Sequence, residues 1–512
     1  MNIIRLSFFL LVSLNIYAQP MAVLHADSGK TQISKHIYGH FAEHLGRCIY
    51  DGFYVGDGNS AIPNENGVRK DIIEALKKLK VPNLRWPGGC FADAYHWKEG
   101  IGPKQNRPTM VNRWWGATVE DNSFGTHEFL GLCEQIGAEA YLAGNVGSGT
   151  VQELSDWVDY TNIAPGKGPM GTLRVQNGRE QPWNVRYWGV GNESWGCGGN
   201  MKPEYYATQY RQYATFMADW NNTNKIFRVA SGANGDDMNW TEVLMKEVPA
   251  NLMEGLSLHH YAVINWSAKG SATQFDEVAY MKTMKQAWKM DDIVTRHSAI
   301  MDKYDPRKRV ALVVDEWGGW YEVEPGTNPG HLFQQNTMRD AMIAGLTLNI
   351  FNNHADRVRI ANLAQTVNVL QAVILTEKEK MILTPTYHVM EMYNVHQDAT
   401  LLPVVVNSPD YIVGDEKIPA VSVSASRNKE GITHVSLVNM DASKKQDITI
   451  DIKGAKFNTA NARILTSGKL QDYNSFTQPD KIKPSAFSGA SISGNSLKVS
   501  LPPFSVVVIA LK

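Results

Sequence analysis

The chain has 512 residues, more than one ordinary hydrophobic core organises, so a large domain followed by a smaller one is expected. Its 50 basic and 51 acidic residues nearly cancel, which gives no support to a nucleic-acid or polyanion partner. The four cysteines, Cys48, Cys90, Cys133 and Cys197, show no paired metal-ligand spacing, so no metal site is expected. A disulfide is allowed in an exported protein but not demanded.

The first residues have the pattern of a secretory signal peptide. Arg5 supplies a positive charge, residues 6–14 form an apolar run, and Ala18 is acceptable before a cleavage site. The apolar run is too short to cross a bilayer as a mature helix. We therefore predict a signal peptide over residues 1–18 and an exported protein, with periplasm and medium both open.

The next part of the chain predicts a parallel barrel. Residues 19–35 read as a strand segment that is expected to join a later β-sandwich. Residues 36–385 alternate apolar strand-like runs with amphipathic stretches such as 68–79 and 203–220, which indicates a (β/α)8 TIM barrel. The eight expected strands are 37–41, 83–86, 140–146, 186–190, 228–232, 256–260, 311–315 and 357–361.

The pattern changes after about residue 385. Helical periodicity fades, and short β-branched runs separated by turn residues predict an all-β sandwich over residues 386–512. The clearest of these runs are 420–424, 434–438, 448–452, 462–465, 497–501 and 505–509.

Polar residues stand at the ends of seven of the eight expected barrel strands. A core would not tolerate such residues unpaired, and active sites of barrels lie at the carboxyl ends of the strands. The sequence therefore predicts a concave polar site at that end. The candidate residues are Glu43, Arg85, Cys90, Asn145, Asn192, Glu193, His259, Tyr261, Glu316 and Gln365.

Glu193 and Glu316 suit glycoside hydrolysis, because they follow the fourth and seventh strands, on opposite sides of the ring. One carboxyl group would donate a proton to the leaving oxygen, and the other would attack the anomeric carbon. Asn192 could bond the sugar 2-hydroxyl, and the charge of Arg85 would keep Glu316 ionised. Asp315 is expected to face away from Glu316 and to be structural, since side chains alternate along a strand.

An ordered set of motifs resembles the α-L-arabinofuranosidases of glycoside hydrolase family 51. The set runs through nearly the whole expected barrel, which makes it far more specific than any single Asn-Glu pair. It comprises Ile37-Tyr-Gly-His-Phe-Ala-Glu-His-Leu-Gly-Arg-Cys-Ile-Tyr50, Arg85-Trp-Pro-Gly-Gly89, Gly100-Ile-Gly-Pro103, Gly191-Asn-Glu193, Asp315-Glu-Trp317 and Ala361-Asn-Leu-Ala-Gln365.

The resemblance implies a retaining, exo-acting enzyme that needs no cofactor and can form a homo-oligomer. Glu193 would be its acid/base and Glu316 its nucleophile, acting on arabinan- or arabinoxylan-type glycans. His259 matches a pocket histidine and is preferred to His260, because it shares a strand face with Tyr261. The positions that would hold the furanose or orient the nucleophile are Glu43, Asn192, Tyr261 and Gln365.

Two departures from the family pattern affect the expected pocket. Cys90 stands where many members have asparagine, which removes an amide that could contact the sugar. Gly318 and Gly319 stand where bulkier residues are common, which alters the side of the leaving group. Trp115 is a further candidate for the pocket wall.

Two other functions stay open at this point. The first is a different glycosidase specificity on the same barrel, such as an endo-acting enzyme on xylan or glucan, which would need aromatic side chains beyond the pocket. The second is a glycan-binding protein without catalysis, which is disfavoured because both carboxylates are present. Product profiles and a turnover assay separate the three.

Overall fold

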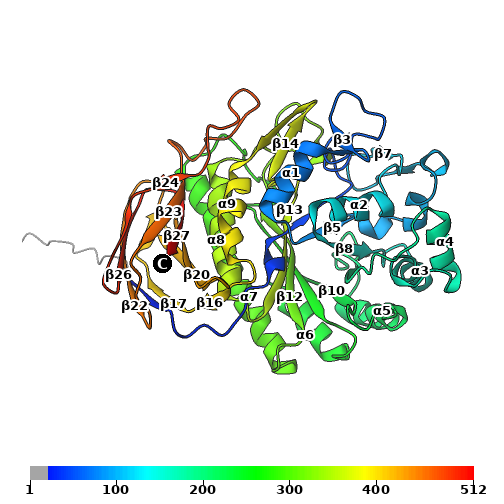
Figure 1. The fold of residues 1–512 in the computed structure, drawn as a ribbon, viewed down its shortest axis with the longest axis horizontal. Coiled ribbons are helices and arrows are strands. Elements are labelled where there is room, and N and C mark those ends of the chain that lie inside the picture. The colour runs from blue at the N-terminus through cyan, green and yellow to red at the C-terminus, as the bar shows by residue number, and fades with distance from the viewer. Residues whose placement is uncertain (1–20) are drawn as a thin grey trace, which may run out of the picture.

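A computed structural model describes residues 21–512 (Figure 1). The predicted signal peptide over residues 1–18 lies outside these described residues. Among the helices of residues 21–512, none has the length and apolar character needed to cross a membrane.

The central element is a closed barrel of eight parallel strands. Its order around the ring is β10-β11-β12-β13-β2-β5-β8-β9, so each strand neighbours the next one along the chain. This confirms the predicted (β/α)8 barrel. The strands are β2 (Gly39–Phe41), β5 (Asn83–Trp86), β8 (Glu139–Gly144), β9 (Tyr187–Val190), β10 (Phe227–Asn234), β11 (Gly255–Ala262), β12 (Ala311–Gly319) and β13 (Val358–Ala364).

Strand boundaries differ from the sequence prediction in ways that affect the site. The first strand is shorter, because residues 35–38 form a 3-10 helix whose first turn is capped by the Ser34 side chain. β11 and β12 run further than predicted. As a result, Tyr261 and Glu316 lie within barrel strands, where the ladder of hydrogen bonds holds their backbones.

Helices surround the barrel, as expected for this fold. In α1, Ile72, Ile73, Leu76 and Leu79 share one buried face, which gives the helical spacing seen in the sequence. The predicted helix 203–220 ends earlier, at Phe216. The helices are α1 (Lys70–Leu79), α2 (Thr126–Ile136), α3 (Val151–Asn162), α4 (Gly168–Gln176), α5 (Pro203–Phe216), α6 (Met238–Glu247), α7 (Glu277–Tyr304), α8 (Met338–Asn353) and α9 (Pro385–Tyr393).

Strands of the C-terminal region form two sheets beside the barrel, on the side covered by α8 and α9 (Figure 1). β1 (Met21–His25) lies between β17 and β22, far from it in sequence, so the start of the described chain belongs to a sandwich sheet. The first sheet is β17 (Val404–Asn407), β1, β22 (Gln446–Lys453), β26 (Ser496–Leu501) and β25 (Ala490–Ser493). The second is β16 (Thr400–Leu402), β20 (Val421–Arg427), β21 (Thr433–Asn439), β27 (Ser505–Leu511), β23 (Ala460–Leu465) and β24 (Ser485–Phe487).

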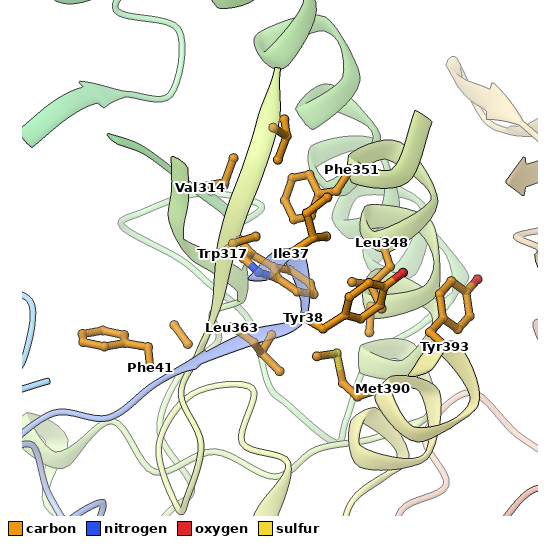
Figure 2. Close-up of a cluster of buried hydrophobic side chains, with 14 of the residues drawn as sticks. Ile37, Tyr38, Phe41, Val314, Trp317, Leu348, Phe351, Leu363, Met390 and Tyr393 are labelled. Carbon is orange, nitrogen blue, oxygen red and sulfur yellow. The ribbon is translucent and has the colours of Figure 1, made fainter. Parts of the chain in front are cut away.

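The outer face of β12 packs against α8 in a buried cluster (Figure 2). The rings of Trp317 and Phe351 meet edge-on with centroids 5.5 Å apart, and the Tyr38 hydroxyl donates to Asn352 at 2.8 Å. Val314 lies in the same cluster, three residues before Trp317. The two residues between them, Asp315 and Glu316, are therefore free to face the interior of the barrel.

Candidate active site

Two glutamates face each other at the carboxyl end of the barrel. Glu316 lies on β12, and Glu193 follows β9 in a backbone conformation with φ of 40°. One carboxylate oxygen of each, together with a ring nitrogen of His259, lie within 4.8 Å of one another. Retaining glycosidases place their two carboxyl groups roughly 5–5.5 Å apart, whereas inverting enzymes leave a wider gap for water. The narrow gap fits a double displacement.

Asp315 also faces the barrel interior, so the expectation that it points away from Glu316 is wrong. The reason is a bulge in β12. Val314 and Trp317 pair with Ala361 and Leu363 of β13, so three steps on one strand match two on the other. The extra residue breaks the alternation and turns two consecutive carboxylates inward.

The Glu316 carboxylate is held by Arg85 and Tyr261. The Arg85 guanidinium donates to Oε1 at 3.0 Å, and the Tyr261 hydroxyl donates to Oε2 at 2.8 Å. Removing one partner of such a buried ion pair lowers the stability of the folded protein by about 3–5 kcal/mol. The pair therefore holds the carboxylate strongly in this position. The backbone of Gly89 lies close by: a Cβ there would sit 2.6 Å from Oε1 of Glu316, which explains glycine at this position.

Asn192 is fixed from both sides. Its side-chain oxygen accepts a hydrogen bond from Arg85 at 2.6 Å, and its backbone N–H donates to the buried Asp93 at 2.7 Å. Asp93 also accepts from the backbone N–H groups of Val146 and Gly147 at 2.7 Å each. One buried carboxylate therefore ties the loops after β8 and β9 together, and the Asn192 NH₂ group lies 3.8 Å from the Cys197 sulfur.

Glu43 joins the loops that follow β2, β5 and β13. Its Oε1 accepts from the backbone of Gly89 at 3.0 Å and from the Trp115 indole at 2.9 Å, and its Oε2 accepts from Gln365 at 2.8 Å. Burial, followed by the repulsion of Glu316, raises the pKa of Glu43 to about 7. Trp115, only loosely placed from the sequence, thus belongs to the site.

Cys90 forms a disulfide with Cys197, which joins the loop after β5 to the loop after β9. The Cys197 sulfur lies 3.5 Å from Oε2 of Glu193. Where many family members carry an amide, this chain therefore presents disulfide sulfur beside the acid/base candidate.

The recorded hydrogen bonds of Asn145, another predicted site residue, stay within the loops around it and do not reach Glu193 or Glu316. Its side-chain oxygen accepts from the backbone N–H groups of Ser148 and Gly149 at 2.9 Å each, and its NH₂ group donates to the Tyr95 carbonyl at 3.1 Å. Its amide thus shapes the loop after β8. The sequence showed only that it stands at a strand end.

A cavity of about 560 Å³ opens beside Glu193 and runs along the carboxyl end of β10, β11 and β12. Trp266, whose side chain is 59% exposed, meets the ring of Trp320 edge-on at 5.4 Å. Trp320 in turn meets the ring of Tyr261 at 5.1 Å. The cavity wall also includes Trp195, Asn234, Asp236, His260, Gln286 and Lys289.

Several residues around the site escaped the sequence analysis. Asp93, and Tyr141, whose hydroxyl donates to Oδ2 of Asp315 at 2.7 Å, lie in stretches without a motif, and only contacts across the barrel bring them to the site. Trp195 and Trp320 stand two and four residues after the catalytic candidates, and this proximity was a usable signal. Trp266 and Lys289 have no such signal in the sequence, because only the fold brings their segments to the cavity.

Comparisons with known proteins agree with this geometry. A model of the alpha-L-arabinofuranosidase 1 domain matches residues 75–280, and a model of the alpha-L-arabinofuranosidase C-terminal domain matches residues 315–505. A Bacteroides ovatus protein named intracellular exo-alpha-L-arabinofuranosidase is 54% identical over 508 residues, 98% of each chain. An Aspergillus niger protein named probable alpha-L-arabinofuranosidase C is 31% identical over 89% of this chain and 91% of its own.

Solved structures show the same relationship. The GH51 arabinofuranosidase from Xanthomonas axonopodis pv. citri superposes with a TM-score of 0.95 at 47% identity, over 96% of this chain and 100% of that one. The Thermotoga maritima alpha-L-arabinofuranosidase arabinose complex gives 0.83 at 30% identity, over 96% and 99%. A bifunctional glucanase-xylanase at 13% identity and 0.62 shares the fold alone.

The comparison with the Bacteroides ovatus protein corrects the predicted export. The Bacteroides ovatus relative covers 98% of this chain and is named intracellular. The charged and apolar pattern of the first residues, taken alone, was therefore insufficient to predict secretion.

The two domain models, the relatives that match along nearly the whole chain, and a carboxylate pair at the spacing of retaining enzymes lead to one conclusion: the chain belongs to the α-L-arabinofuranosidases of glycoside hydrolase family 51.

Proposed function

We propose that Glu316 is the nucleophile and Glu193 the acid/base with which this exo-acting, retaining α-L-arabinofuranosidase releases terminal arabinofuranose. The observation that carries the assignment is the short gap between the two carboxylates, with Arg85 bonded to Glu316 and not to Glu193. The Arg85 guanidinium holds the Glu316 carboxylate in one orientation, from which an oxygen can attack the anomeric carbon.

The reaction proceeds in two balanced steps. A Glu316 oxygen bonds to the anomeric carbon while the bond from that carbon to the leaving oxygen breaks, and Glu193 gives its proton to that oxygen. Water then attacks the same carbon, Glu193 takes a water proton, and the bond to Glu316 breaks. Two inversions return the sugar with its original configuration.

The environment of Glu193 suits its role as acid. Burial raises the pKa of Glu193, the hydrogen bond from His259 opposes that rise, and the negative charge of Glu316 adds to it. A raised pKa means that Glu193 keeps its proton to higher pH than an ordinary glutamate. The acid step is therefore available up to that pKa and is lost as the pH rises through it.

The furanose pocket is closed around Glu316 by Glu43, Asn192, Tyr261 and Gln365. Tyr261 donates to Glu316, Gln365 donates to Glu43, and Arg85 donates to Asn192. These contacts support roles in holding the sugar and orienting the carboxylate. Asn192 is placed to donate its NH₂ group to the 2-hydroxyl, an interaction that strengthens in the transition state.

The cavity beyond Glu193 would receive the leaving saccharide, since the acid/base stands on the side of the leaving oxygen. Its exposed aromatic wall at Trp266 is a flat apolar surface on which a second sugar of a polysaccharide backbone can lie. This favours arabinoxylan- or arabinan-type chains over small arabinosides as natural substrates.

Replacing Trp266 by alanine should lower kcat/KM on arabinoxylan or arabinan oligosaccharides about tenfold, equivalent to roughly 1.4 kcal/mol for one lost aromatic contact. Activity on 4-nitrophenyl arabinofuranoside should stay within about twofold, because its leaving group is too short to reach this wall. Trp220→Ala is the matched control, since this indole is 47% exposed and lies outside the cavity. Equal losses on both substrate types would contradict the proposed wall.

Product profiles test the overall assignment. Arabinan, arabinoxylan and cello-oligosaccharides are incubated with the protein, and products are separated over time. The proposal expects free arabinose as the sole early product from the first two and no cleavage of the third. Early release of backbone oligosaccharides would support the endo-acting alternative, and binding without any product would support a non-catalytic role.

We also propose the division made from the sequence: a catalytic barrel over residues 36–385 and a sandwich over 386–512 that includes the segment 19–35. The pairing of β1 with β22 supports the last point. Assembly into a homo-oligomer is part of the proposal, and gel filtration with light scattering would measure it.

A further inference from the structure

The imidazole of His259 lies among three carboxylates. Its Nδ1 is 2.8 Å from Oε1 of Glu193 and 3.5 Å from Oε2 of Glu316, and its Nε2 is 3.1 Å from Oδ1 of Asp315. The ring is buried. His259 is therefore the one side chain in the described chain with recorded contacts to both catalytic carboxylates and to Asp315.

Asp315 is fully engaged in this arrangement. Its Oδ1 meets His259, while its Oδ2 accepts from the Tyr141 hydroxyl at 2.7 Å and lies 3.6 Å from Nε of Arg85. Burial acts to raise the pKa of Asp315, but the charges of Arg85 and His259 outweigh it and lower the pKa to about 2. An ionised carboxylate only accepts hydrogen bonds, so Nε2 of His259 must carry a proton.

The second ring nitrogen, Nδ1, is protonated as well, because the surrounding carboxylates favour the charged imidazolium. Burial acts to lower the pKa of His259, but Glu316, Asp315 and Glu193 outweigh it and raise the pKa to about 10. Other groups facing the ring's surroundings are Arg85 from β5, Tyr141 from β8 and Tyr261 on the same strand. With both nitrogens protonated, Nδ1–H donates to Oε1 of Glu193.

We propose that Asp315 is a positioning residue for the acid/base: by keeping both nitrogens of His259 protonated, it makes Oε1 of Glu193 accept a hydrogen bond and leaves the catalytic proton on Oε2. In residues 21–512 the recorded neighbour of Oε2 is the Cys197 sulfur, which has no hydrogen to donate in the disulfide. Oε2 is thus free for the leaving oxygen. This inference rests on the proposed role of Glu193.

The alternative state explains why the charge of Asp315 matters. A neutral His259 protonated only on Nε2 would present a lone pair to Glu193. The carboxyl proton of Glu193 would then point at the ring, away from the leaving group. A neutral ring also no longer stabilises ionised Glu193, so Glu193 would keep its proton to higher pH.

Nitrogen NMR of histidine-labelled protein tests the proposal without relying on activity, with His259→Asn to assign the signal. In the wild type, both His259 nitrogens should be protonated at neutral pH. In Asp315→Asn, the midpoint of the His259 titration should move down by about 1 to 3 pH units, because an adjacent anion is lost. A wild-type ring that is neutral at neutral pH would overturn the proposal, even if the variant does not fold.

The pH dependence of kcat/KM on an aryl arabinofuranoside supplies the second readout. The alkaline limb of Asp315→Asn should move to higher pH by about one unit, with a fall in kcat at lower pH, where Glu193 must ionise to act as base. Asp291→Asn is the matched control, because Asp291 contacts Nε2 of His354 at 2.8 Å outside the barrel, and it should leave the profile unchanged. A wild-type profile in Asp315→Asn would overturn the proposal.

Different results would contradict the proposed function and the proposed role of Asp315. If the wild type hydrolyses no arabinofuranoside while the His259 titration still shifts in Asp315→Asn, the relation between Asp315 and His259 is supported and the proposed function is not.

Discussion

Replacing Glu316 by glutamine is expected to lower kcat/KM on an aryl arabinofuranoside by about 10⁴- to 10⁶-fold, the scale of effect when a nucleophile is removed. The amide retains the shape of the side chain. Its oxygen can still accept from Arg85 while its NH₂ group donates to the Tyr261 hydroxyl oxygen, but it cannot form the glycosyl-enzyme. Initial rates on the purified variant, with circular dichroism to confirm folding, give the measurement.

The control for this variant is Glu430→Gln, which neutralises an exposed glutamate in the turn between β20 and β21. It should retain wild-type activity. Azide added to Glu316→Ala should yield arabinofuranosyl azide of inverted configuration, because the small anion attacks from the side that the carboxylate occupied. Wild-type rates in Glu316→Gln would refute the assignment of the nucleophile.

Replacing Glu193 by alanine should have a large effect that depends on the leaving group. General acid catalysis contributes about 10²- to 10⁴-fold, so oligosaccharides, whose leaving oxygen needs a proton, should lose that much in kcat/KM. Aryl substrates with acidic leaving groups should lose roughly tenfold or less in the first step. A series of aryl arabinofuranosides measures this as a steeper dependence of rate on leaving-group pKa.

The second step of Glu193→Ala should be slow, because no base activates water, and glycosyl-enzyme should accumulate. Azide needs no base, so it should restore turnover and give the azide of retained configuration. Glu204→Ala, an exposed change in the first turn of α5, is the control. The same fractional loss on every leaving group, with no response to azide, would rule out an acid/base role.

Much of this fold could be predicted because its signals are local. Eight apolar runs, seven of them with polar ends, are visible in the sequence, since the barrel strands are largely buried while their carboxyl ends open to the pocket. The strands β18 (Asp410–Val413) and β19 (Glu416–Pro419), which form a separate two-stranded sheet, were missed, because their partly exposed residues lack an apolar run.

What could not be predicted depends on contacts between distant segments. The bulge in β12 reversed the expected direction of Asp315, and no glycine or proline before it marks the irregularity. The disulfide joins Cys90 to Cys197 across 107 residues, and spacing alone does not give a pairing. The family motifs predicted Glu193 and Glu316 as the catalytic pair, which stays a prediction. They gave no signal for Asp93 or Trp266, which only the folded loops bring to the site.

Two contacts of Glu193, the proposed acid/base, set its surroundings. Disulfide sulfur adjoins Oε2 of Glu193, and His259 links its Oε1 to Asp315. Glu316 is held by Arg85, Tyr261 and His259, whereas Glu193 is partly exposed and borders the cavity of about 560 Å³. Variation between this chain and its relatives is therefore expected in leaving-group preference more than in the sugar cleaved.

The most direct test of the central claim is to find the residue that bonds to the sugar. The protein is incubated with an arabinofuranose-configured cyclitol epoxide, digested, and sequenced by mass spectrometry. A single label on the peptide carrying Glu316, lost in Glu316→Gln and retained in Glu193→Ala, is the predicted result. A label on Glu193 or Glu43, or a protein that turns over substrate with inversion and takes no label, would contradict it.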